Sequence, residues 1–200
     1  MKTQNEILTP EESMQIITKS LSNFKKNFRE KSDYVLLWGY VIAIGSLAHF
    51  SILKYLLVKE MYDKIELASY VVWAVFALTG FIIQFFMIAR SRAERKAVSN
   101  LDRNYTILWY IAAITIFLIA FLSLKFGIYP APFILAVVGM ATLISGLLIR
   151  FRPLIIGGMI FFLFSIITAY VTNEYQLLLN ALAIITGYII PGYILRSAKE

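Results

Sequence analysis

The chain has 200 residues, 60% of them hydrophobic, with a formal net charge of +7, one histidine and no cysteine. A soluble domain is about 45–50% apolar, so this composition indicates a membrane protein with little chain left for a second folded domain. The missing cysteine excludes disulfides and thiolate catalysis, and a single histidine cannot form the usual zinc site, so we expect no metal and no cofactor. The positive charge fits anionic lipid headgroups better than nucleic acid, so no nucleic-acid partner is expected.

Residues 1–33 are the one sizeable polar segment, which we predict to be a cytoplasmic amphipathic arm. Thr9, Pro10 and Glu12 have the pattern of a helix start with a capping box. Beyond them, large apolar residues recur at spacings of three and four and form one seam of a helix: Met14, Ile17, Leu21, Phe24 and Phe28. The seam either lies on anionic lipid or pairs with another subunit or a partner protein. We favour docking on the membrane or on the protein's own cytoplasmic loops, because two heptads are short for a self-sufficient coiled coil.

Six apolar stretches follow, each about long enough to cross a bilayer core of about 30 Å, which takes roughly 20 helical residues. Backbone polar groups in that layer need internal partners, so these stretches are predicted to be helices. We place the spans at Tyr34–Leu57, Ala68–Ala89, Thr106–Leu124, Tyr129–Ile149, Leu154–Thr172 and Leu177–Leu195. The predicted fold is an all-α, six-helix transmembrane bundle over residues 34–196, followed by a cytoplasmic tail at residues 197–200.

The distribution of Lys and Arg predicts the orientation of the bundle. The arm holds six, the loop after the second span five, the loop after the fourth span two and the C-terminal segment two. Fifteen basic residues therefore fall on one side of the membrane against four on the other. Under the positive-inside rule, both termini are expected in the cytoplasm.

Few polar side chains lie inside the predicted spans, and these are the candidates for a site. His49 in the first span and Asn180 in the sixth are expected at similar depth in the outer half of the membrane, so we consider them a candidate interhelical polar pair. A ligand or proton role for His49 is the less favoured alternative. Ser46 shares a helix face with His49, but no third orienting group accompanies them, so catalysis is not expected. Lys54 is expected to reach the headgroups, and Gln84 to hydrogen-bond between helices.

Pro191 marks the sixth span as irregular. It cannot donate a hydrogen bond to the carbonyl of Gly187, four residues earlier, and Gly187 and Gly192 give the backbone room. We predict a kink near the cytoplasmic end of this helix, and with it a candidate hinge formed by Gly187, Pro191 and Gly192.

The arm, the segment Leu37–Gly39 and the segment Leu47–Phe50 resemble an uncharacterised family of small multi-pass inner-membrane proteins of the Bacteroidota. The resemblance covers the arm and the first span, and it implies an inner-membrane location without implying an activity. We expect a non-catalytic scaffold or regulatory subunit that contacts lipid, a protein partner or a second copy through its arm and basic loop. A small transporter or channel for an apolar or weakly polar solute is the alternative, and a membrane enzyme ranks third.

Overall fold

The computed structural model describes residues 9–12, 14–16, 18, 32–91, 100–171 and 174–197. Within these ranges six helices are long and apolar enough to cross a membrane. The first five are α2 (Ser32–Val58), α3 (Ile65–Ser91), α4 (Asn100–Phe126), α5 (Ala131–Ile149) and α6 (Arg152–Tyr170), and a short 3-10 helix, η1 (Tyr62–Lys64), precedes α3. The sixth span is divided into α7 (Tyr175–Ile184), a π-helical segment, η3 (Ile185–Ile189), and α8 (Ile190–Ser197). The predicted all-α six-helix fold is confirmed.

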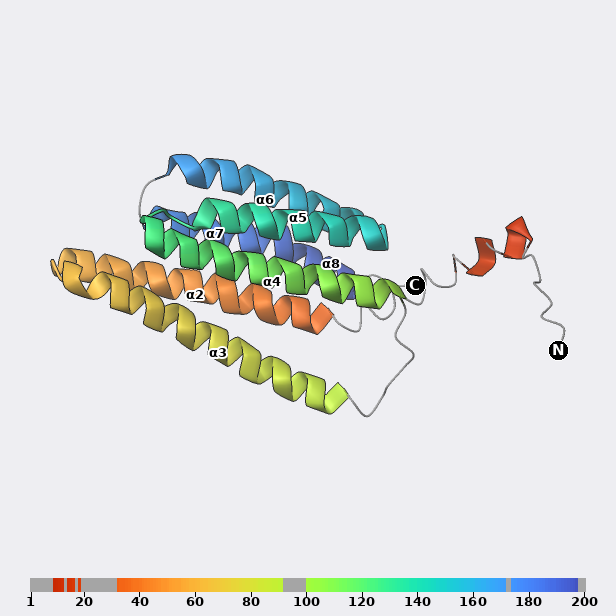
Figure 1. Cartoon of the computed structure of the whole chain (residues 1–200), viewed down its shortest axis with the longest axis horizontal. Helices are drawn as coiled ribbons and strands as arrows, with labels where there is room; N and C mark the ends of the chain where they lie inside the picture. The colour runs from red at the N-terminus through yellow and green to blue at the C-terminus, as the bar shows by residue number, and fades with distance from the viewer. Residues whose placement is uncertain are drawn as a thin grey trace.

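The helices run alternately in opposite directions through the bundle. The start of α2, the end of α3, the start of α4, the turn between α5 and α6 and the end of α8 all lie at the same end (Figure 1). We call it the basic end, because exposed arginines gather there: Arg90, Arg103, Arg150, Arg152 and Arg196. The end of α2, the start of α3, the end of α6 and the start of α7 lie at the opposite end (Figure 1).

The core of the bundle is formed by α2, α5, α6 and the sixth span. Leu135, Ile149 and Phe161 are completely buried in it. Glycines let α5 and α6 pack with their backbones in contact: a Cβ on Gly146 would lie 2.7 Å from the backbone nitrogen of Ile155. A Cβ on Gly158 would likewise lie 2.7 Å from the Leu143 backbone. Small residues allow this approach in membranes, where the hydrophobic effect does not drive helices together.

Helices α3 and α4 lie at the edge of this core. Only 11% of the most apolar stretch of either helix is buried, against 44% for α5 and for the sixth span. Helix α3 packs on α2 and α4 packs on α5. Toward the basic end α3 diverges from α2 (Figure 1). Many apolar side chains of α3 are exposed within the described part of the chain.

Three turns use the same left-handed cap. Glu60, Gly127 and Arg150 have φ values of 55°, 64° and 52°, and each follows the end of a helix. The next residue in each case donates to the carbonyl five residues before it, as in the bond of 2.9 Å from Phe151 N to Gly146 O. This is the Schellman arrangement, which satisfies carbonyls left free at a helix end and normally favours glycine. Two of the three positions hold residues with a side chain, so these turns carry some backbone strain.

Candidate functional site

Polar contacts link the first span to the last along its whole length. Starting at the basic end, Asp33 pairs with Arg196 at 3.3 Å, and the hydroxyls of Tyr40 and Tyr193 lie 2.6 Å apart. Farther along, Ser46 meets Asn180, and Lys54 meets Glu174 and Tyr175. Because α2 and the sixth span run antiparallel, their polar side chains meet in reverse order of sequence. We treat this series of contacts as the candidate site.

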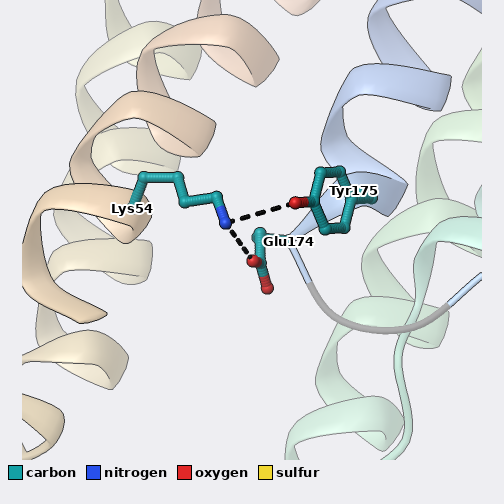
Figure 2. Close-up of polar contacts among 3 residues, drawn as sticks. All are labelled: Lys54, Glu174 and Tyr175. Carbon is teal, nitrogen blue, oxygen red and sulfur yellow. Dashed lines mark hydrogen bonds and ion pairs between the residues drawn. The ribbon is translucent and has the colours of Figure 1, made fainter. Parts of the chain in front are cut away.

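The contact at the end of the bundle opposite the basic end partly buries a carboxylate, that of Glu174. Lys54 Nζ lies 2.8 Å from Glu174 Oε1 and 3.4 Å from the Tyr175 hydroxyl (Figure 2). It also lies 4.9 Å from the centre of the Tyr175 ring, in cation–π range. The side chain of Glu174 is only 11% exposed. Lys54 therefore joins α2 to the residues that begin α7, and its reach to the headgroups stays a prediction.

The electrostatics of Glu174 follow from this geometry. The hydrogen bond from Lys54 is the main reason that the pKa of this carboxyl lies below its ordinary value, and a backbone hydrogen bond at Glu174 lowers it further. Burial acts in the opposite direction but does not prevail. Glu174 is consequently ionised at neutral pH, when its pairing with Lys54 is complete.

His49 bonds to α3 rather than to the sixth span. Its Nε2 lies 2.9 Å from Ser69 Oγ, and Ser69 Oγ in turn donates to the Ile65 carbonyl at 2.8 Å. A serine hydroxyl has one hydrogen, so Ser69 accepts from His49, and the neutral ring must carry its proton on Nε2. The Nδ1 atom is buried without a partner among the described residues. His49 therefore joins α2 to α3.

Asn180 bonds to Ser46 and not to His49. Its Nδ2 donates to Ser46 Oγ at 2.8 Å, and Ser46 donates to the Ile42 carbonyl at 2.8 Å. The predicted contact between the first and sixth helices is therefore present, but the predicted pair of His49 with Asn180 is wrong. Each side chain instead meets a serine that has already given its hydrogen to its own helix. Ser46 lies one turn from His49, so an error of one turn separates the expected partner from the real one.

The sixth span has a π-helical segment, η3, shortly before Pro191, and the predicted kink at this place stays a prediction. The Ile190 N–H bonds to the Ile185 carbonyl, five residues earlier, which widens the helix just before Pro191. Gly187 lies in this segment, and a Cβ on Gly157 of α6 would overlap the Gly187 carbonyl oxygen. The hydrogen that Gly157 carries in place of a Cβ therefore points at that oxygen, as in a weak Cα–H···O contact. Gly187, Pro191 and Gly192 are all buried, and their action as a hinge stays a prediction.

A second polar contact between α2 and α3 lies toward the basic end. Trp38 Nε1 donates to Gln84 Oε1 at 2.6 Å, as expected of an interhelical bond for Gln84. The Trp38 ring rests on Gly80, where an added Cβ would lie 3.2 Å from it, and meets the Phe81 ring edge to face at 5.0 Å. Because an indole nitrogen can only donate, the orientation of the Gln84 amide is determined.

The arm is described only in part. Thr9 N bonds to Glu12 Oε2 at 2.9 Å, and Glu12 N bonds to Thr9 Oγ1 at 3.2 Å, so the predicted capping box is confirmed. Met14, the first residue of the seam, is 66% exposed. The other four seam residues lie outside the described residues: Ile17, Leu21, Phe24 and Phe28.

The contacts described above join helices to one another. No group of three or more His, Asp or Glu side chains capable of holding a metal occurs within the described ranges. No protein-family model, curated protein or solved structure matches the chain. The class of the protein therefore rests on the fold alone, which is that of a multi-pass integral membrane protein.

Proposed function

We propose that the chain is a non-catalytic scaffold or regulatory subunit of a bacterial inner membrane, with both termini in the cytoplasm. The observation that supports this is the backbone-to-backbone packing of α5, α6 and the sixth span at Gly146, Gly157, Gly158 and Gly187. Helices in such contact leave no space between them for a solute. A large displacement of one helix against another would require their packed backbones to separate. A body of this kind suits a protein that holds or orients others.

The contact surfaces of this scaffold are its cytoplasmic arm and the basic loop after α3. The seam beginning at Met14 offers an apolar strip, and residues 90–103 contain five basic residues against two acidic ones. These surfaces suit an anionic membrane or an acidic, partly apolar partner.

Copurification tests the scaffold role. The full chain should be extracted with its surrounding bilayer in polymer nanodiscs, and stoichiometric proteins identified by mass spectrometry. We expect Phe24→Glu with Phe28→Glu to release the partner, since charge on the seam opposes its burial. Ser22→Glu with Asn27→Glu adds the same charge off the seam and should retain it. Absence of any stoichiometric protein with the unaltered chain would refute the proposal.

Reporter fusions test the orientation. Fusions after residues 96 and 200 should both read cytoplasmic, and a fusion after residue 174 should read external, because the basic end is expected inside. An external reading at residue 200 would reverse the proposed orientation.

A small transporter for an apolar or weakly polar solute is the second candidate, and the π-helical η3 favours it, since such segments occur often at functional sites. Purified protein in liposomes that carried solute without any partner would support this alternative over the scaffold.

A further inference from the structure

A groove of about 720 Å³ lies between α3 and α4 in the half of the bundle nearer the basic end. Its walls include Leu78, Phe81, Ile82, Gln84 and Phe85 of α3, together with Tyr110 of α4. Phe81 and Phe85 are 60% and 66% exposed, so no other part of the described chain covers them. The wall is fixed in shape by Trp38, which packs on Gly80 and Phe81 behind the groove.

We propose that this groove binds one anionic phospholipid from the leaflet at the basic end. Arg90 follows Phe86 by four residues and Arg103 precedes Tyr110 by seven, so each arginine lies on the side of its helix that faces the groove. Both arginines are exposed at the end of the bundle where headgroups lie. Their positive charge complements a lipid phosphate, and the aromatic wall below them complements an acyl chain.

Gln84 provides the polar group that such a lipid needs between its phosphate and its chains. It lies six residues from Arg90, about 9 Å deeper along the helix axis. The Gln84 oxygen is engaged by Trp38, so its two N–H donors are the groups left for a further acceptor. The ester carbonyls of a phospholipid, which lie between its phosphate and its acyl chains, are acceptors of this kind.

Charge also argues against a second copy of this chain in the groove. Copies inserted with the same orientation have their basic ends at the same level, so a dimer through this groove brings Arg90 and Arg103 of both copies together. Like charges in contact cost free energy, whereas an anionic lipid neutralises them. The inference is independent of the scaffold proposal, because it concerns a different surface and is measured without a protein partner.

Native mass spectrometry of the purified full chain tests the site, with phosphatidylglycerol and phosphatidylcholine titrated separately. We expect one phosphatidylglycerol to bind about thirtyfold more tightly than phosphatidylcholine, because both lipids have a phosphate but only phosphatidylglycerol has a net negative charge, and two arginines near such a headgroup can supply this preference. Arg90→Gln with Arg103→Gln should abolish this preference. Arg150→Gln with Arg152→Gln removes the same charge from the same end of the bundle and should retain it.

The apolar wall is tested in the same way. Phe81→Ala with Phe85→Ala should weaken the binding of both lipids about tenfold, whereas Phe117→Ala, at a 75% exposed position of α4 outside the groove, should leave it unchanged. Equal affinity for the two lipids, or an equal loss of preference in the two double arginine variants, would overturn the proposal. The proposal would also be overturned if the lipid-free chain forms a dimer and Phe81→Ala with Phe85→Ala abolishes this dimer.

Discussion

Gly157→Ala should be strongly destabilising, because the added methyl has no space. Its Cβ would overlap the Gly187 carbonyl oxygen and lie 3.1 Å from the Gly187 carbonyl carbon, both of which are backbone atoms of the π-helical segment. A side chain can rotate away from such a clash, but a backbone held by its own helix must move with its neighbours. Overpacking costs about 1–3 kcal/mol, and we expect the upper end here. Alanine regains up to about 1 kcal/mol of helix propensity, so the net loss should be about 2–3 kcal/mol.

The measurement is the thermal unfolding of the purified chain in a fixed detergent. At about 2–4 °C per kcal/mol for a chain of this size, Tm should fall by roughly 4–12 °C. Gly45→Ala is the matched control in another membrane helix: its Cβ would meet the Phe76 ring at 3.2 Å, and the ring can give by a few tenths of an ångström. If Gly157→Ala melts no lower than Gly45→Ala, the backbone contact between α6 and η3 is not as close as described.

Three further outcomes follow from the same structure. Glu174→Gln should lower Tm at neutral pH but not in acid, because a carboxyl with a lowered pKa stabilises the fold above its ordinary pKa and loses this effect as the pH falls through the folded pKa. A Tm difference that persists at about pH 3 would refute the ion pair. In double-mutant cycles of unfolding, His49→Leu and Ser69→Ala should be coupled by about 0.6 kcal/mol, while His49→Leu and Asn180→Leu should be additive. Additivity in the first cycle with coupling in the second would restore the pair of His49 and Asn180 predicted from the sequence. Gly127→Ala should cost about 1 kcal/mol from its φ of 64° alone, since no atom lies within 4 Å of the added Cβ, and an unchanged Tm would mean that the turn readily changes conformation.

The six spans could be predicted because the thickness of a bilayer imposes a length on any apolar helix, whatever its neighbours. The capping box at Thr9 and Glu12 was also accessible, since it depends on residues within one helical turn. The widened turn before Pro191 could not be predicted: Pro191 removes a donor, but the close contact with Gly157 belongs to another helix.

The hydrogen-bond partners of His49 and Asn180 could not be predicted from the sequence either, because they too belong to other helices. Serine is frequent in membrane helices, and its hydroxyl usually bonds to the backbone of its own helix, as in Ser46 and Ser69. The serine oxygen can still accept a hydrogen bond from another helix, but no sequence pattern shows which serine does so. Choosing between Ser46 and His49 as the partner of Asn180 requires the rotation of two helices to within one turn. Glu174 was missed because it lies in a turn, and its pairing with Lys54 follows only once α2 and α7 are known to be neighbours.

The contacts between the first span and the last have a consequence for how the chain is made. Asn180 follows Ser46 by 134 residues, so during synthesis α2 enters the membrane long before its polar partners exist. Until the sixth span inserts, Lys54 and Ser46 must find water, lipid headgroups or their own backbone. The sixth span therefore supplies the polar partners that Lys54 and Ser46 lack until it is in place.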